Sequence, residues 1–376
     1  MRRLTQQRGR PGGAALLVAL FGDPSRAKDL SVPQWDALLR VARVEKLLSR
    51  LGAVLQTVPQ TFTAGPPEVG PMFRAALAYP ELVQARAAWE VHRILSATAD
   101  LDVEFVLLKG AAYVQAGLPL ARARAFADVD LLVREAELSG VEARLLARGW
   151  QRQTTNAYDQ RYYRDWMHEI APLRHPERQI EVDLHHRILP RTSRLAPSPG
   201  LLWEASIRVG PRLRVLAPAD MVLHCATHLF YDGEVRGHFR DLLDCQQLLL
   251  HFSSLDPDFW DLLSARARDL ALGRPLYYAV RFCHEILDLA VPDRVLRALH
   301  QDAPALVIDA WMGHLVRRTL PPRELGRGGA RVSGWLLYVR SHWLRMPPGM
   351  LFMHLLRKGW RRLSTLGSWQ SRTVDS

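Results

Sequence analysis

The chain has 376 residues, of which 48% are hydrophobic and 23% are charged. This composition excludes a disordered or collagen-like chain. Three cysteines without a CxxC motif argue against a disulfide-stapled domain and favour the reducing cytoplasm. The formal net charge of +12 favours an anionic partner, and the alternative is that an arginine-biased composition produces much of the excess charge. The charge lies at the two ends, because residues 1–10 carry four arginines, residues 311–376 have a net charge of +10, and residues 11–310 sum to −2.

The N-terminus combines arginines with an apolar run from Ala14 to Phe21, as a signal peptide does. The run is short, lacks an A-x-A cleavage site and ends at Gly22-Asp23-Pro24, so it favours a first amphipathic helix packed on the body. No uncharged apolar stretch reaches the about 18 residues that a transmembrane helix needs. The sequence therefore predicts a cytoplasmic protein without a transmembrane segment, with peripheral membrane contact as the alternative.

Hydrophobic periodicity predicts the remaining elements in chain order. Apolar residues at intervals of three and four indicate helices over 33–55 and 80–99. Short apolar runs and turn residues then indicate strands at 105–108, 129–133, 161–164, 168–173 and 179–184. Helices are expected between and after these strands, over 111–116, 135–148, 220–230, 239–252, 257–270 and 275–287.

This order of elements predicts an α+β fold, with a small mixed-sheet core flanked by N-terminal and C-terminal helical regions. The expected division is a helical region over 1–100, an α/β core over 101–190, a helical domain closing the cleft over 191–310 and a basic extension over 311–376. Aromatic residues are interleaved with the arginines of that extension, so it is a candidate for binding RNA or an anionic membrane surface. The alternative is that its aromatic residues pack on the protein body.

Two aspartates are the most informative feature of the middle of the chain. Asp128 and Asp130 alternate along an expected strand, so their side chains share one face. A divalent cation is one reason to hold two like charges side by side, and Mg²⁺ prefers carboxylates together with phosphate oxygens. Asp183 would provide a third acid from a second strand, and Glu181 shares its face as the alternative. The other interpretation of such a pair is a solvated strand edge.

A Lys-Gly turn follows the first expected strand. Gly110 would let the backbone approach a phosphate, the next helix start would offer free N–H groups, and Lys109 would add a positive charge. Arg124, four residues before Asp128, could reach a triphosphate or could be an exposed loop arginine. Lys109 and Gly110 are candidates for nucleotide binding, as is Arg124.

Together these residues resemble a known family. The segment VLLKGAAYVQAGLPLARARAFADVDLLV, followed by IEVDLHHRI, is similar to the uncharacterised nucleotidyltransferase family of the DNA polymerase beta-like nucleotidyltransferase superfamily. The resemblance implies that Asp128 and Asp130 bind metal, that Asp183 is the third carboxylate, and that the Lys109-Gly110 turn replaces the superfamily's Gly-Ser turn. It also implies Mg²⁺ or Mn²⁺ as cofactor and an NTP, such as ATP, as substrate.

The resemblance leaves the acceptor open. The leading expectation is transfer of an NMP group to a hydroxyl or phosphate, in a biosynthetic or peptide-modification pathway. A toxin-like or tRNA-modifying enzyme would instead use the basic extension to bind RNA. A nucleotide-binding module that lost turnover is the third alternative, against which the three intact acids count.

Other polar clusters have weaker signals. His224, Cys225 and His228 could share a zinc ion, but the glutamate of H-E-x-x-H is absent, so we expect them to pack under or beside the cleft. His185 and His186 follow the third acid and either approach the substrates or cap a loop. Arg240, Asp241 and Asp244 lie on one helical turn, which indicates a local ion pair.

Overall fold

The computed structural model describes residues 12–154, 163–164, 166–232, 235–323, 331–347 and 349. The arginines at positions 2, 3, 8 and 10 and most of the basic extension lie outside these residues. The expected first helix is α1 (Gly13–Gly22), which buries Leu17 and Leu20. Helix α1 packs on both α2 (Val32–Val44) and α12 (Gly273–Leu287), so the N-terminal and C-terminal helical regions are in direct contact.

The helix expected over 33–55 is broken in two, which corrects the sequence prediction. Helix α2 ends before Lys46, which has a left-handed backbone (φ 57°), and α3 (Leu48–Gln56) begins after it. The Leu47 N–H donates to the Ala42 carbonyl, the 6→1 bond of a Schellman-type helix end. Glycine usually takes the left-handed position, so a lysine there gave no sequence signal.

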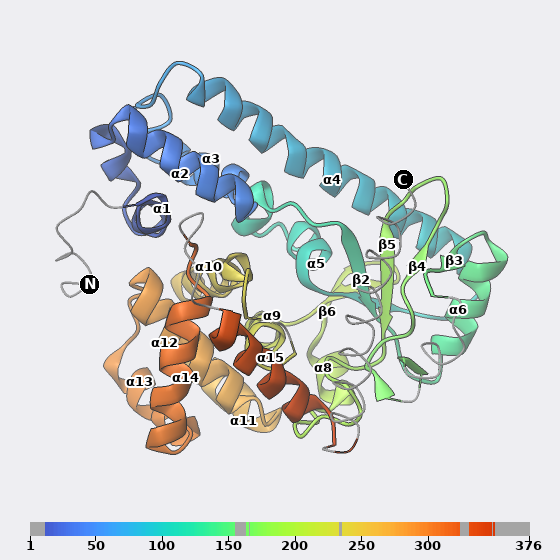
Figure 1. The fold of residues 1–376 in the computed structure, drawn as a ribbon. Helices are drawn as coiled ribbons and strands as arrows, with labels where there is room; N and C mark the ends of the chain where they lie inside the picture. The colour runs from blue at the N-terminus through green and yellow to red at the C-terminus, as the bar shows by residue number, and fades with distance from the viewer. Residues whose placement is uncertain are drawn as a thin grey trace, which may run out of the picture.

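Helix α4 (Val69–Ala97) is longer than the helix expected over 80–99, because it continues through the buried Pro80. It runs from the N-terminal helices to the sheet, where it contacts α5 (Lys109–Gln115) and α6 (Leu138–Ala147) (Figure 1). This single helix therefore connects the N-terminal region to the elements around the candidate site.

A mixed sheet of seven strands forms the α+β core that the sequence predicted. Its strand order is β3 (Gln151–Arg152), β4 (Leu173–Arg174), β5 (Glu181–His185), β2 (Asp128–Leu132), β1 (Phe105–Leu107), β7 (Leu213–Val215) and β6 (Ile207–Gly210). Strands β2 and β5 are parallel, whereas β1 is antiparallel to β2. The two strands that carry the predicted acids are thus neighbours in the centre of the sheet.

Parts of the sheet differ from the sequence prediction. Of the strand expected at 161–164, the first two residues lie outside the described part, and Tyr163 and Arg164 have helical backbone. The strand expected at 168–173 is reduced to β4 and an isolated bridge between Glu169 and His185. The hairpin β6–β7 was not predicted, and it extends the sheet beyond residue 190, where the core was expected to end.

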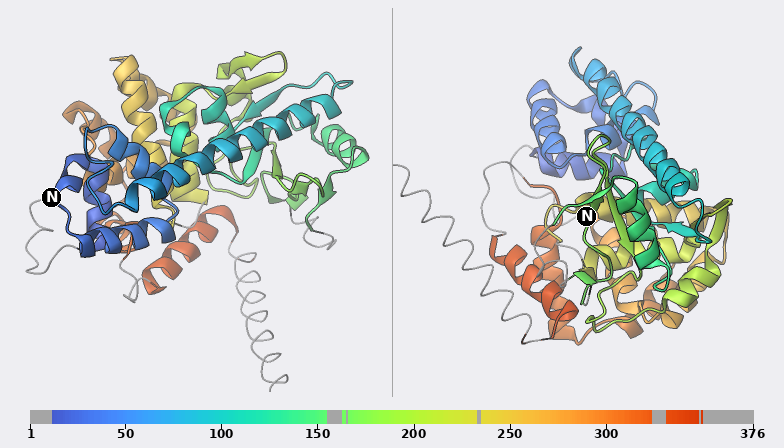
Figure 2. Two further views of the ribbon diagram at one scale, coloured as in Figure 1. Left: turned by 90° about the horizontal axis from the view of Figure 1, so that it is seen from above. Right: turned by 90° about the vertical axis from the view of Figure 1, so that its right-hand side faces the viewer.

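Most of the described chain after β5 is helical, and the four helices expected between residues 220 and 287 are present. The helices of this region are α8 (Pro199–Ala205), α9 (Pro218–Thr227), α10 (Phe239–Leu255), α11 (Phe259–Asp269), α12, α13 (Asp293–Leu299), α14 (Leu306–Thr319) and α15 (Arg331–Arg345). Figure 2 shows these helices gathered beside the sheet and under the N-terminal helices. Within the described part of the chain, no helix combines the length and apolar character that a bilayer crossing needs.

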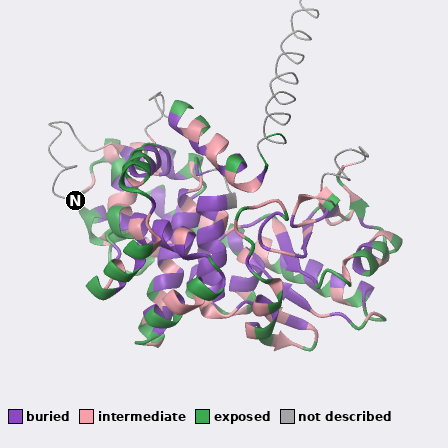
Figure 3. Ribbon diagram, turned by 90° about the horizontal axis from the view of Figure 1, so that it is seen from below, coloured by how far each residue is buried: buried purple, intermediate pink, exposed green. Residues whose placement is uncertain are grey.

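One continuous hydrophobic core joins the three parts. It includes Trp35 from α2, Phe105 from β1 and Phe282 from α12, which are all fully buried. Figure 3 shows buried residues through the interior of the helices and on the central strands. Because the sheet and both helical groups share this core, residues from all three can be held in fixed positions around one site.

Candidate active site

The three predicted carboxylates meet on neighbouring strands. Asp130 on β2 is paired in register with Asp183 on β5, and Asp128 lies two residues earlier on the same face of β2. One carboxylate oxygen from each of the three lies within 4.8 Å of the others. The intervening Val129 and Leu131 are buried on the opposite face, so the alternation of the strand explains why the acids converge. Glu181, the alternative to Asp183, instead pairs with Arg174 at 3.0 Å.

Lys109 is tied to the central carboxylate. Its Nζ donates to Oδ1 of Asp130 at 2.8 Å, and its backbone is left-handed at the start of α5 (φ 46°). Burial alone would lower the pKa of Lys109, but Asp130 raises it above its ordinary value, so the ammonium stays charged. A non-glycine residue in this strained conformation is typical of functional sites.

His185 contacts the same carboxylate from the end of β5. Its Nε2 lies 3.0 Å from Oδ1 of Asp130. Burial alone would raise the pKa of Asp130, which is only 2% exposed, but Lys109 and His185 together hold this pKa below its ordinary value. Asp130 is therefore the ionised, doubly hydrogen-bonded centre of the cluster.

Asp128 and Asp183 lack equivalent partners. Burial and then the Asp130 charge raise the pKa of Asp128. Burial, Asp130 and Glu169 raise the pKa of Asp183 to about 8, and its buried Oδ1 has no hydrogen-bond partner among the described residues. A divalent cation between these oxygens would remove both penalties, so the donor set and its charge fit Mg²⁺ or Mn²⁺.

Glu169 and His168 belong to this region although the sequence did not single them out. The isolated bridge between Glu169 and His185 brings the Glu169 carboxylate within 3.4 Å of His185 Nδ1. His168 Nε2 lies 4.0 Å from the same Glu169 oxygen. The only local signal was two polar residues in an expected strand, and the contact depends on a pairing across the sheet.

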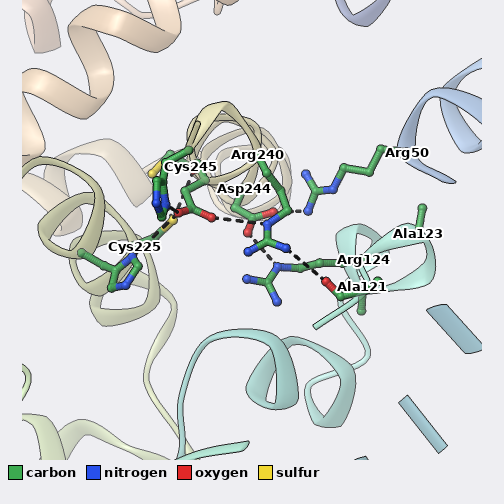
Figure 4. A network of polar contacts seen from close by, with 12 residues as sticks. Arg50, Ala121, Ala123, Arg124, Cys225, Arg240, Asp244 and Cys245 are labelled. Carbon is green, nitrogen blue, oxygen red and sulfur yellow. Dashed lines mark hydrogen bonds and ion pairs between the residues drawn. The ribbon is translucent and has the colours of Figure 1, made fainter. Parts of the chain in front are cut away.

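Arg124 lies beside the Lys-Gly turn and is buried, so it is not the exposed loop arginine that was the alternative to nucleotide binding. Its side chain is buried, and Nε donates to Oδ2 of Asp244 on α10 at 2.8 Å. Arg50 of α3 donates to the other oxygen of Asp244 (Figure 4). The expected local ion pair within α10 is thus wrong for Asp244, which instead joins two arginines from distant parts of the chain.

Gly110 accommodates this arginine. A Cβ at position 110 would lie 2.6 Å from Cγ of Phe126 and would also collide with the Arg124 guanidinium. Arg124 NH1 is buried and has no hydrogen-bond partner among the described residues. The glycine therefore serves close packing by Arg124 and Phe126 behind the turn, in addition to any approach of a ligand in front of it.

Comparison with protein families agrees with this site. The family model described as an uncharacterised nucleotidyltransferase matches residues 31–288. The chain belongs to this family. The match extends from α2 to the end of α12, so it includes the N-terminal helices as well as the acidic strands. Searches of curated proteins and of solved structures found no match.

The other histidines of this nucleotidyltransferase lie at different depths around the site. His224 on α9 is buried, and burial followed by the charge of Lys109 lowers its pKa well below the ordinary value. His228 lies 3.9 Å from Asp241. Neither belongs to the two groups of metal-ligating side chains found in the described residues. His186 lies 3.9 Å from Glu135, and burial and Arg191 lower its pKa to about 4.

Proposed function

We propose that this nucleotidyltransferase moves an NMP group from an NTP to an acceptor hydroxyl or phosphate and requires Mg²⁺ or Mn²⁺. The observation that carries the proposal is the convergence of Asp128, Asp130 and Asp183, with oxygens within 4.8 Å of one another, in a chain of this family. The raised pKa values of Asp128 and Asp183 support it, because both reflect burial together with the neighbouring negative charge of Asp130, which a bound divalent cation would offset.

The three aspartates would hold the metal, with Asp130 contributing through Oδ2 because Oδ1 already accepts from Lys109 and His185. When bound, the metal supplies Lewis acidity at the phosphate that reacts. Under this proposal Asp183 completes the ligand set and takes the proton of an acceptor hydroxyl.

The Lys109-Gly110 turn would hold the phosphates of the NTP. Lys109 Nζ has three donors, so a phosphate oxygen can share it with Asp130. Asp130 fixes the position of this ammonium, and the packing of Arg124 and Phe126 fixes the backbone of Gly110. Under this proposal Arg124 supports the turn from behind and adds a buried positive charge, so its contribution to nucleotide binding is indirect.

The test is transfer of label from each α-³²P-labelled NTP in the presence of magnesium and cell extract. We expect label in one fraction, RNA, protein or small molecules, and we expect no transfer from γ-labelled NTP. Asp128→Asn and Asp183→Asn should abolish the signal. Glu181→Gln is the matched control, because Glu181 lies on β5 beside Asp183 but pairs with Arg174.

Two results would overturn the proposal. Label appearing from the γ-phosphate would show phosphoryl transfer instead. Manganese binding, followed by electron paramagnetic resonance, that persisted in the Asp128→Asn plus Asp130→Asn double variant would remove the metal assignment. Circular dichroism of each variant establishes that the loss of signal is not a loss of fold.

A further inference from the structure

A second group of metal-ligating side chains lies next to the three aspartates. His168, Glu169 and His185 each offer a ligand atom within 4.8 Å of the other two. His168 and His185 are buried, and their rings lie 5.3 Å apart. Two imidazoles and one carboxylate differ chemically from the all-oxygen set of aspartates, because nitrogen ligands favour first-row transition metals over Mg²⁺.

The hydrogen bonding of His185 points to a ligand on its second nitrogen. The Asp130 carboxylate accepts a hydrogen bond from Lys109 and lies 3.0 Å from His185 Nε2. Because an ionised carboxylate can only accept hydrogen bonds, the proton of His185 must be on Nε2. Nδ1 then faces the Glu169 carboxylate at 3.4 Å, yet this buried nitrogen has no hydrogen-bond partner among the described residues. A cation held by Nδ1 and the Glu169 carboxylate would give this nitrogen a partner.

The same geometry recurs at metal sites. A metal-binding histidine commonly donates its other ring N–H to a carboxylate, which fixes the tautomer and the orientation of the ring. Here Asp130 is that carboxylate and Nδ1 is the nitrogen left for metal. Zinc sites with three protein ligands from histidine and glutamate keep a fourth position open for water or substrate.

We propose that His168, Glu169 and His185 bind a divalent transition-metal ion, best matched by Zn²⁺, at a site separate from the Mg²⁺ site of the three aspartates. Asp130 connects the two sites, because its Oδ1 contacts the ligand His185 while its Oδ2 is left for the aspartate site. Metal at His185 Nδ1 would lock the tautomer that donates to Asp130. The second metal would then be a positioning element for the central carboxylate.

Cobalt is the probe, because Co²⁺ replaces Zn²⁺ and its visible absorption reports the ligands. The full-length chain is freed of metal with a chelator, dialysed into excess magnesium and titrated with Co²⁺. We expect one strong equivalent with the intense bands of a low-coordinate site that contains nitrogen, displaced by Zn²⁺. If cobalt bound to the wild-type chain instead gave the weak visible spectrum of six-coordinate oxygen ligation, the proposal would be overturned, and this result needs no variant.

Variants locate the site. His168→Asn and Glu169→Gln should each weaken cobalt binding by at least about tenfold, the size of effect that even outer partners of a metal show. Asp128→Asn plus Asp183→Asn should keep the nitrogen-ligated spectrum, and His224→Asn plus His228→Asn is the control for the other histidine pair. Unchanged cobalt affinity in His168→Asn and Glu169→Gln would show that Glu169 and His185 form only a proton-mediated ion pair.

This inference does not rest on nucleotidyl transfer. Cobalt bands that survive when transfer is absent would support the second site and reject the proposed function. Nucleotidyl transfer that survives chelation of zinc in excess magnesium, in a chain that binds no cobalt, would support the proposed function and reject the second metal site.

Discussion

Asp130 and Asp183 lie directly opposite each other on the parallel strands β2 and β5, and only one of them is neutralised. Lys109 and His185 both contact Asp130, whereas Asp183 has a buried oxygen without a partner among the described residues. Because Asp130 stays ionised, its repulsion acts on Asp183, which is buried beside it without a neutralising partner among the described residues. The cost of this repulsion makes Asp183 useful for binding a cation, and it should be measurable as lost stability.

We expect Asp183→Asn to stabilise the metal-free protein at alkaline pH. The carboxyl ionises near pH 3.8 when unperturbed but only at about 8 in the folded chain, so the folded state holds its proton longer than the unfolded state. Stability should therefore fall as the pH rises from about 4 to about 8. Asparagine removes this loss, and urea unfolding with a chelator at about pH 8 should show a gain of more than about 1 kcal/mol.

At about pH 4 the wild-type chain and Asp183→Asn should have similar stability, because the carboxyl is then largely protonated in the folded chain. Glu181→Gln on the same strand should leave the pH dependence unchanged. Added magnesium should restore stability to the wild-type chain at alkaline pH and leave Asp183→Asn unaffected. Parallel pH profiles for the wild-type chain and Asp183→Asn would contradict the uncompensated charge.

Lys109→Met should destabilise the protein through Asp130. Removing one partner of a buried pair costs about 3–5 kcal/mol, and we expect about 2–3 here because His185 still contacts the carboxylate. The double variant Lys109→Met plus Asp130→Asn should recover most of that loss, since it removes the stranded charge. Urea unfolding of the two single variants and the double variant gives the coupling free energy directly.

Nucleotide affinity separates the structural role of Lys109 from its proposed role with phosphate. Binding of a fluorescent ATP analogue with magnesium should stay lost in the stable double variant. Lys28→Met, which changes an exposed lysine far from the sheet, is the control for charge alone. Full recovery of binding in the double variant would mean that Lys109 acts only on Asp130.

The sequence predicted that the three acids would lie together because their signal is local. Alternation along a strand places Asp128 and Asp130 on one face, and a second strand with the same polarity pattern supplied Asp183. The contacts of Asp244 were not predictable in this way. Its two arginines lie 120 and 194 residues away in the chain, and no periodicity connects residues at such separations.

Other features that the sequence analysis did not predict were overlooked for different reasons. The hairpin β6–β7 did leave a signal, because Ile207 and Val209 alternate with polar residues before a Gly-Pro turn, and Leu213 and Val215 alternate after it. Glu169 left only a weak signal, as one of two polar residues in an expected strand, since its position depends on a single bridge to β5. Local patterns thus predicted the strands of the site, whereas tertiary pairing chose the groups that surround them.

The ion pairs of Asp244 predict a large effect on stability from a residue that is not a candidate metal ligand. Asp244 is the carboxylate between the buried guanidinium groups of Arg50 and Arg124 (Figure 4). Asp244→Asn would leave the two guanidinium groups buried without a carboxylate partner, so we expect a loss of about 3–5 kcal/mol in the free energy of unfolding. Asp261→Asn should cost no more than about 1 kcal/mol, because its pair with Arg294 is exposed.

Arg50→Met tests whether loss of one arginine costs less stability than loss of the shared carboxylate. It leaves Asp244 paired with Arg124 and removes a second positive charge from the same buried cluster, so its cost should be clearly smaller than that of Asp244→Asn. Chemical denaturation of these variants decides the order. An Asp244→Asn chain as stable as Asp261→Asn would show that the two arginines do not depend on this carboxylate.

Gly110 and Gly140 offer a matched comparison of the same substitution in two helices. Gly110→Ala places a Cβ 2.6 Å from Phe126 and against Arg124, so we expect a loss of about 1–3 kcal/mol from overpacking. Gly140 on α6 has open space around its Cβ position, and alanine there should stabilise the helix by up to about 1 kcal/mol. Thermal unfolding of both variants checks the opposite signs.

The clash in Gly110→Ala should also affect nucleotide binding, because the residues that must move to relieve it lie next to the site. The atoms that would meet the new methyl group belong to Phe126 and Arg124, two residues before and four residues before Asp128, so relief of the clash would shift the start of β2 together with the turn. Gly110→Ala should therefore weaken binding of a fluorescent ATP analogue as well as stability, and Gly140→Ala should leave binding unchanged. A Gly110→Ala chain with normal affinity would mean that the turn does not position the nucleotide.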